Sequence, residues 1–322
     1  MREFFVNKND AGQRLDRFAS RCAPGIPSGL LQRYFRTKDI KVNGRWVKPD
    51  VRLREGDAVR LYIPDEFFGG KQKADGYAWL SSLRPDIDIV YEDENLLLVN
   101  KRQGVLCHAA SGWSADTLIA QIQAHVFRAG QWDPARENSF APALCNRIDR
   151  GTGGIVIAAK TAEALRELDD RIRSRQLDKE YLCVCLGTPS PERGRLENWL
   201  FKDAVKNQVY AKPRQEPGCS LAVTEYRVLS SRSGLSLVEC RLLTGRTHQI
   251  RVQMAHSGHP LLGDGKYGVE KMNRKYRESR QLLWSYRLTF AFPPDGGPLD
   301  YLSGRSFAVE RVPFAEKYFP AP

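Results

Sequence analysis

Residues 146–154 read Asn146-Arg147-Ile148-Asp149-Arg150-Gly151-Thr152-Gly153-Gly154, and the fold and chemistry of the chain are organised around them. An acid flanked by two guanidiniums is expected to stay ionised, because nearby positive charge favours the carboxylate. Asp149 is therefore a candidate nucleophile and not a proton donor. The glycines permit positive φ and close approach to a bulky neighbour, and residues 155–159 predict a buried strand. The same residue types also occur in ordinary solvent-exposed turns.

Length and charge narrow the possible classes of protein. A chain of 322 residues favours one large domain and one small one. The formal net charge is +12, from 50 Lys and Arg against 38 Asp and Glu, which favours nucleic acid as a partner. A membrane partner is not expected, since no apolar run reaches about 18 residues and no lipidation signal occurs. Residues 1–10 lack the order of a secretory signal, so we expect a cytoplasmic protein.

Neither the cysteines nor the histidines predict a metal centre. The seven cysteines are odd in number and contain no C-x-x-C pair, which argues against a zinc ribbon or a disulfide framework. Cys183 and Cys185 lie in a strand-like run, where free cysteines are small buried hydrophobes. His248, His256 and His259 have no carboxylate at a standard ligand spacing, and no HExxH pattern occurs. We therefore expect no metal.

Residues 1–64 predict a small module. Residues 13–21 and 28–35 have helical spacing, with Ser28 as the N-cap of the second helix. Residues 40–42, the turn Asn43-Gly44 and a return strand at Trp46 predict a hairpin, and residues 58–63 alternate like a strand. This order resembles the S-four-type RNA-binding domain. The resemblance implies phosphate contacts from the exposed basic residues Arg14, Arg17, Arg33, Arg36 and Lys38; a solvated helix face is the alternative for each.

Residues 65–87 lose periodicity and predict a linker. The aromatic residues in it either pack against a domain or stack on bases, and packing is the commoner fate. These residues are Phe67, Phe68, Tyr77 and Trp79.

Residues 88–322 predict a larger, strand-rich unit. Residues 88–101 read as strand, acidic turn and strand, with Lys101 at the end. Helices are predicted at 117–127 and after Thr161, which is a candidate N-cap. Residues 178–187 predict a strand that begins with Lys179 and Tyr181, and residues 193–240 predict short strands. A last helix is expected to be capped by Thr247.

Three segments together resemble the RluA-type family of RNA pseudouridine synthases: residues 146–154, Lys179-x-Tyr181, and Thr244-Gly245-Arg246-Thr247-His248-Gln249-Ile250-Arg251. With the element from Gly258 to Asp264 and the module in front, the resemblance covers nearly the whole chain and is closest to the RluC/RluD branch. It implies an α+β catalytic domain on a long, largely antiparallel mixed sheet with a central cleft. It also implies isomerisation of flipped-out uridines in structured RNA, most closely large-subunit ribosomal RNA, by a monomer without a cofactor.

The resemblance also assigns roles to residues. Asp149 is the catalytic acid, Tyr181 packs against the target base, and Arg251 pairs with Asp149 in bidentate geometry. Whether Asp149 attacks the sugar or the base, or takes a ribose proton, stays open. The expected substrate-binding residues are Arg147, Arg150, Thr152, Lys179, Arg246, His248 and Gln249.

Two departures from the family pattern bear on these roles. Asn146 stands where many members have His, and Gly153 stands where Ser is common. An imidazole role at position 146 is therefore excluded. A non-catalytic RNA-binding or ribosome-assembly protein with the same fold is the alternative function.

Overall fold

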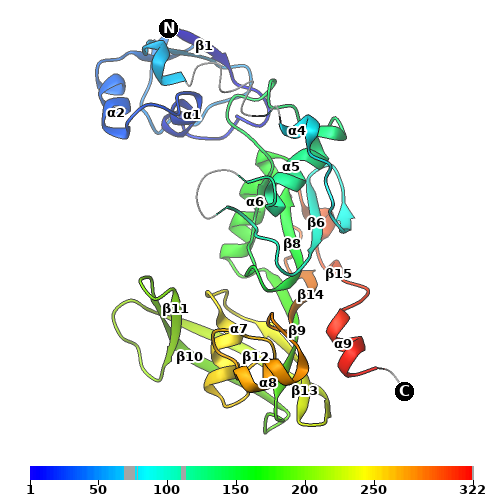
Figure 1. Cartoon of the computed structure of the whole chain (residues 1–322). Helices are drawn as coiled ribbons and strands as arrows, with labels where there is room; N and C mark the ends of the chain where they lie inside the picture. The colour runs from blue at the N-terminus through cyan, green and yellow to red at the C-terminus, as the bar shows by residue number, and fades with distance from the viewer. Residues whose placement is uncertain (69–76, 78, 110–113, 321–322) are drawn as a thin grey trace.

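The computed structural model describes residues 1–68, 77, 79–109 and 114–320. These residues form a small amino-terminal module and a larger unit built on one extended sheet (Figure 1). The molecule is bent, with the module at one end and the hairpin of β10 (Arg193–Asp203) and β11 (Gln208–Lys212) at the other (Figure 1). None of the described helices has the length and apolar character needed to cross a membrane.

The module has two helices against a four-stranded antiparallel sheet of order β1-β4-β2-β3. The predicted hairpin is confirmed, because Asn43 and Gly44 both take positive φ, 51° and 78°. The cap predicted for Ser28 is wrong: Pro27 is the N-cap and Ser28 is already helical. The elements are β1 (Arg2–Phe5), α1 (Leu15–Cys22), α2 (Ser28–Arg36), β2 (Ile40–Val42), β3 (Arg45–Trp46) and β4 (Ala58–Leu61).

The aromatic residues of the predicted linker pack into the two units that it joins. Phe68, at the end of the 3₁₀ helix η1 (Asp65–Phe68), is buried in the core of the module. Tyr77 and Trp79 pack against the core of the larger unit, with Leu80 of α4 (Trp79–Ser82) buried beside them. The glycine- and lysine-rich part of the predicted linker, residues 69–76, lies outside the described residues.

The larger unit carries a sheet of eleven strands among the described residues, in the order β11-β10-β12-β13-β9-β14-β8-β6-β5, with β15 beside β14 and β7 beside β8. Only the β14–β8 pair is parallel in this described sheet, so the predicted α+β class with a largely antiparallel mixed sheet is confirmed. The central cleft stays a prediction. The strands are β5 (Ile89–Glu92), β6 (Leu96–Lys101), β7 (Ala143–Leu144), β8 (Gly153–Ala159), β9 (Leu177–Leu186), β10 (Arg193–Asp203), β11 (Gln208–Lys212), β12 (Cys219–Arg232), β13 (Leu235–Leu242), β14 (Leu283–Phe290) and β15 (Ser306–Ala308).

Helices cover parts of this sheet. α6 packs on β8, and α7 packs on β10, β11 and β12. Thr161 caps α6 as predicted, since its side chain accepts a hydrogen bond from Ala164 N. The cap predicted for Thr247 is wrong, because α7 begins at Gln249 and its N-cap is His248. The helices are α5 (Leu118–Arg128), α6 (Ala162–Arg173), α7 (Gln249–His256), α8 (Glu270–Tyr276), η2 (Asp300–Leu302) and α9 (Pro313–Tyr318).

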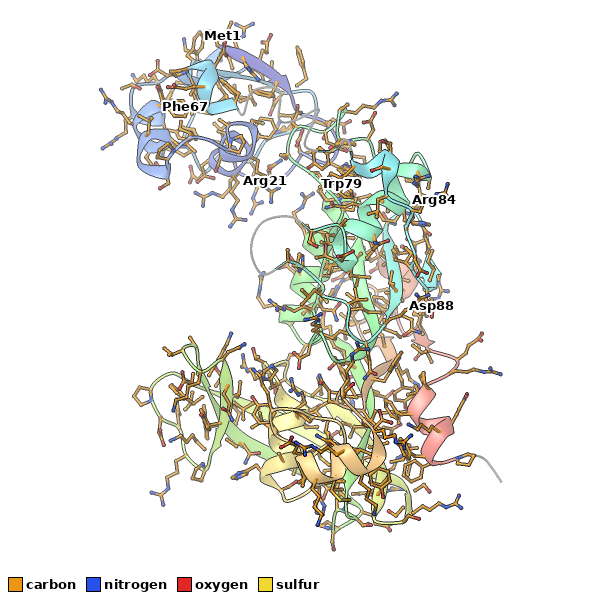
Figure 2. All side chains as sticks on the ribbon, viewed as in Figure 1. Met1, Arg21, Phe67, Trp79, Arg84 and Asp88 are labelled. Atoms are coloured by element: carbon orange, nitrogen blue, oxygen red, sulfur yellow. The ribbon has the colours of Figure 1, made fainter. Side chains whose placement is uncertain are left out.

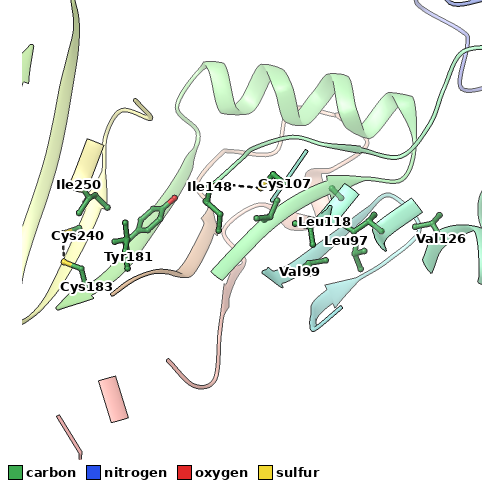
Figure 3. Packing of buried hydrophobic residues seen from close by; sticks show 14 of the residues in the cluster. Leu97, Val99, Cys107, Leu118, Val126, Ile148, Tyr181, Cys183, Cys240 and Ile250 are labelled. Carbon is green, nitrogen blue, oxygen red and sulfur yellow. Dashed lines mark hydrogen bonds between the residues drawn. The ribbon is translucent and has the colours of Figure 1, made fainter. Parts of the chain in front are cut away.

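One apolar core lies beneath the middle strands and positions the neighbouring polar residues. Ile148 and Ile250 are both buried in it, together with Tyr181 (Figure 3). Cys183 is fully buried there, as predicted. Asp149 and Arg251 directly follow the two anchored isoleucines, so the core fixes the backbone from which both charged side chains project. Burying each isoleucine contributes about 1.5–3 kcal/mol toward holding that backbone in place.

Candidate active site

Asp149 meets Arg251 at a site carried by the middle of the sheet. Nη1 of Arg251 donates to Oδ2 of Asp149 at 2.9 Å across 102 positions of sequence. The Arg251 side chain is 7% exposed, whereas that of Asp149 is 28% exposed. The expected contact is therefore present, with the guanidinium on the protein side and the carboxylate partly open to solvent.

The bidentate partner of Arg251 is a different acid, which corrects the geometry expected from the sequence. Nε and Nη2 of Arg251 donate to the two carboxylate oxygens of Asp264 at 2.7 and 2.9 Å. Asp264 is fully buried, and the hydrogen bond to Asp149 is single. Asp264 lies in the Gly258 to Asp264 element, which carried the resemblance but was given no role.

Charge balance in this cluster leaves a negative charge at its open end. Burial alone would lower the pKa of Arg251, but the hydrogen bond and charge of Asp264, together with Asp149, raise it above its ordinary value. Burial likewise opposes ionisation of Asp264, yet Arg251 holds the Asp264 pKa below its usual range. Because Asp264 already balances the guanidinium, the three groups together carry one net negative charge, and Asp149 is its solvent-facing end.

His248 and Tyr267 border the carboxylate. Nε2 of His248 lies 3.8 Å from Oδ2 of Asp149, and its Nδ1 is hydrogen-bonded to the Tyr267 hydroxyl at 2.8 Å. His248 takes φ 55°, and this left-handed turn replaces the predicted Thr247 cap. Burial is the largest cause of the lowered pKa of His248, which favours a neutral imidazole at neutral pH.

The glycines after Asp149 let the backbone of its loop pack so closely against β14 that a side chain at position 153 or 154 would overlap that strand. Gly154 has φ 109°, and a Cβ there would lie 2.1 Å from the carbonyl oxygen of Ser285. A Cβ on Gly153 would lie 2.4 Å from the Trp284 ring. Positive φ thus applies to Gly154 alone of the three loop glycines, and close approach explains Gly153.

Lys101 binds the backbone of the same loop. The sequence predicts no role for it. It is 1% exposed, and its Nζ donates to the carbonyls of Val105 at 2.9 Å, Arg102 at 3.0 Å and Arg150 at 3.3 Å. Burial lowers the pKa of Lys101 to about 8. A lysine at the end of an apolar strand was the available signal, but its burial depends on carbonyls from two separate segments.

Tyr181 lies on β9, and its ring is buried in the same core as Ile148, the residue before Asp149 (Figure 3). Burial raises the pKa of Tyr181 to about 12, and the charge of Asp149 adds to the effect. The hydroxyl is therefore protonated at neutral pH. Lys179 lies two residues earlier on the same face of the strand, and burial lowers its pKa.

The other expected substrate-binding residues fall into two groups. Arg147, Arg150 and Arg246 are exposed, and the last two each donate from Nε to one backbone carbonyl. Thr152 and Gln249 are buried and bonded within the protein. Both ends of the Gln249 amide are occupied, by Thr244 Oγ1 and Arg246 N at Oε1 and by Val223 O and Thr224 Oγ1 at Nε2. This placement favours a structural role for Gln249.

The basic residues expected to contact RNA in the module lie at its surface. Arg17, Arg33, Arg36 and Lys38 are exposed, and Arg14 is exposed but ion-paired with Asp16 at 2.6 Å. Among the described residues no group of three or more His, Cys, Asp or Glu side chains is arranged to hold a metal ion.

Comparisons with known proteins agree on one family. A family model described as RNA pseudouridylate synthase matches residues 95–256. The ribosomal large subunit pseudouridine synthase C of Escherichia coli (strain K12) is 29% identical over 298 residues, covering 90% of this chain and 89% of the relative. That of Haemophilus ducreyi (strain 35000HP / ATCC 700724) is 30% identical over 294 residues, covering 90% and 88%.

A solved structure supports the fold. Human RNA pseudouridylate synthase domain containing 4 has a TM-score of 0.55 and 21% sequence identity, covering 76% of this chain and 94% of that one.

Proposed function

This chain belongs to the RNA pseudouridylate synthase family, of the RluA type, and from that premise we propose that it modifies specific uridines in large-subunit ribosomal RNA through Asp149. The enzyme is an isomerase that converts uridine to pseudouridine in RNA. The ribosomal target rests on the names of the curated relatives, which are ribosomal large subunit enzymes. Their similarity over about nine-tenths of both chains also supports the RluC/RluD branch.

The observation that carries this proposal is the partly exposed carboxylate of Asp149, held by a buried arginine that a second acid already balances. In the reaction the bond between N1 of the uracil and C1′ of the ribose breaks, the uracil rotates, and its C5 forms a new bond to C1′. C5 then releases its proton and N1 gains one, so the reaction has no net change in composition. A carboxylate can act here by attacking the sugar, by attacking the base, or by taking a ribose proton. The hydrogen bond from Arg251 fixes the direction in which the Asp149 carboxylate points, as each route requires.

The target nucleotide must leave its stack to reach Asp149, at a cost of a few kcal/mol. The Tyr181 ring belongs to the apolar core and lies close enough to Asp149 for that charge to affect its pKa, so we assign it packing against a flipped uracil. Its raised pKa favours that role over acceptance of a proton by a resting phenolate. Arg147 and Arg150 are exposed next to Asp149 and are suited to hold the displaced backbone.

The distribution of paired charges supports one RNA-binding side. Three arginines on the sheet face opposite Tyr181 are neutralised by acids: Arg287 by Glu180, Arg241 by Asp178 and Arg227 by Glu239. The exposed Arg147, Arg150, Arg33, Arg36 and Lys38 form no ion pair within the described residues. RNA is therefore expected along the site and the S-four-type module at residues 1–64, ahead of the catalytic domain at residues 88–322. We place the enzyme in the cytoplasm as a monomer.

The test is Asp149→Asn, with pseudouridine and RNA affinity measured on the same protein. We expect product to be abolished and affinity to stay within a few-fold, because the change removes one charge and keeps the shape. Asp170→Asn, the same change at an exposed position on α6, is the matched control and should retain full activity.

The same experiment separates the enzyme from the alternative of a non-catalytic ribosome-assembly protein. Such a protein would yield no pseudouridine with the wild-type chain. If the wild type is active and Asp149→Asn still makes pseudouridine, the assignment of the catalytic acid is wrong.

A further inference from the structure

The module and the catalytic domain are joined by a set of directional hydrogen bonds. We call this contact the joint: residues 7–13, between β1 and α1, against residues 136–139, between α5 and β7. Asn7 and Asn9 donate to the two carboxylate oxygens of Glu137 at 3.0 and 2.6 Å. Ser139 donates to Oδ1 of Asp10 at 2.5 Å, and Asn138 donates to Oδ2 of Asp10 at 2.7 Å.

Asp10 is the centre of the joint. It is 0% exposed, and both its oxygens accept hydrogen bonds from neutral donors. The donors come from both units, since Gln13 and the Asn7 backbone also reach Asp10 from the module. A buried acceptor that loses its donors costs about 1–3 kcal/mol, more when charged. The buried carboxylate therefore favours one docked orientation over sliding, because hydrogen bonds weaken steeply with angle.

The joint is also connected to the catalytic loop through α6. Oδ1 of Asn9 accepts from Ala162 N in the first turn of α6 at 3.1 Å. α6 packs on β8, the strand that begins four residues after Asp149. On the module side, Arg21 at the end of α1 donates to Ser139 O at 3.5 Å, and Figure 2 shows Arg21 on the side of the module that faces the catalytic domain.

We propose that the joint is a specificity determinant: it holds the module at one distance and orientation from Asp149, so that only a uridine at a set separation from the module's RNA contact enters the site. A module on a loose tether would let one anchored RNA present several uridines in turn. A docked module instead admits only the uridine that lies at one fixed distance along the RNA from the module's contact. This inference rests on the proposed function, because it requires RNA to contact both units.

The test is a joint variant, Asn9→Ala/Glu137→Ala/Ser139→Ala. Every hydrogen bond recorded for these three side chains crosses between the units, so neither unit loses an internal bond of theirs. Two substrates are compared. One is a full-length large-subunit ribosomal RNA transcript, and the other is a short stem-loop around one modified uridine, too small to span both units.

On the long RNA we expect kcat/KM at the native uridines to fall about tenfold and uridines that the wild type leaves unmodified to gain pseudouridine. On the stem-loop we expect kcat/KM within about twofold of wild type. Replacing Glu137→Ala by Glu137→Gln in the variant keeps one carbonyl acceptor and should restore part of the selectivity. Asp65→Ala, which removes an exposed acid just after the module that is bonded to Arg2 outside the joint, should behave as wild type on both RNAs.

Two outcomes overturn the proposal. Unchanged rates and sites on the long RNA would mean that docking does not select the uridine. An equal loss on both RNAs would mean that the joint merely supports the catalytic domain. If the triple variant does not fold, the same rates and sites are measured with the single variant Ser139→Ala. Asp149→Asn assayed alongside tests the proposed function separately, since it should inactivate the enzyme on both RNAs whatever the joint does.

Discussion

Arg251 is shared between two acids of unequal exposure, and this sharing determines what substitutions do. The two Asp264 bonds require a planar fork, and a third nitrogen must still point at Asp149. A lysine retains the charge but cannot make all three contacts. Replacing Arg251 by lysine is therefore expected to reduce activity more than it reduces stability.

Arg251→Lys should lower kcat about 100-fold, the loss typical of removing one preorganised donor. Arg251→Met should in addition destabilise the fold by about 3–5 kcal/mol, because Asp264 would remain buried without a cation. Pseudouridine assays and urea unfolding measure the two effects. Arg241→Lys, at a pair on the opposite sheet face, is the control and should change neither. A fully active Arg251→Lys would contradict a role for the Asp149 contact.

Lys101 predicts a pH-dependent stability. Its pKa falls from an ordinary value near 10.5 to about 8 on burial, so between these values the unfolded chain binds a proton that the folded chain has released. Stability from this group therefore rises with pH across that window and is flat below about pH 8. Relative to Lys101→Met, which has no titrating side chain there, the free energy of unfolding of the wild type should rise by about 3 kcal/mol between pH 8 and 10.5. Urea unfolding at several pH values measures the difference; a constant difference would mean that burial leaves the Lys101 pKa unshifted.

At the scale of elements, the parallel pair β8–β14 positions the loop that carries Asp149. Its register sets Gly153 opposite Trp284 and Gly154 opposite Ser285. The indole of Trp284 fills the space that a side chain at position 153 would need, and its Nε1 donates to Asn100. This contact gives a physical reason for the glycine at position 153.

Gly153→Ser should destabilise the fold by about 1–3 kcal/mol, the usual range for overpacking, and reduce activity by displacing Asp149. Trp284→Leu should relieve the overlap, so that the double variant is less destabilised than the sum of the single variants. Thermal or urea unfolding of all four proteins gives the coupling energy. Additive effects would show that Trp284 is not the obstacle.

The elements that the sequence predicted are those with local signals. The apolar run at 155–159 predicted a buried strand, Asn43-Gly44 predicted a hairpin, and Thr161 predicted a cap, and all three are confirmed. β1 was not predicted, because its partner β4 lies more than fifty positions away. The Thr247 cap failed because the contacts of His248 with Tyr267 and Asp149 favour a left-handed residue one position later.

The candidate site was predictable only in part, for the same reason. Asp149 and Arg251 stand out by their motifs, and their contact was expected. Asp264 and Lys101 are recognisable only from tertiary structure. Asp264 matters because it binds the Arg251 guanidinium, and Lys101 because its Nζ binds backbone carbonyls of two separate segments. Sequence alone also does not show that Arg246 is exposed whereas the Gln249 amide is buried and hydrogen-bonded within the protein.

At the scale of the whole molecule, the net charge of +12 is distributed unevenly, and this asymmetry predicts the salt dependence of RNA binding. Three arginines on the sheet face opposite Tyr181 are already paired with acids, so they are expected to release few counterions on meeting RNA: Arg227, Arg241 and Arg287. Arg33, Arg36 and Lys38 are exposed on the module. Each that contacts a phosphate should contribute about −0.7 to −0.9 to the slope of log affinity against log salt.

The full-length variant Arg33→Gln/Arg36→Gln/Lys38→Gln should therefore bind the long RNA more weakly at low salt and have a slope shallower by up to about 2–3. Filter binding or fluorescence titration at four salt concentrations measures it. Arg227→Gln/Arg241→Gln/Arg287→Gln removes the same number of charges from the paired face and should leave the slope nearly unchanged. Equal flattening in both variants would mean that net charge alone attracts the RNA, and an unchanged slope in the first would remove the module from the RNA interface. Only a loss confined to the module variant places phosphates on the exposed basic side chains of α2 and the turn after it.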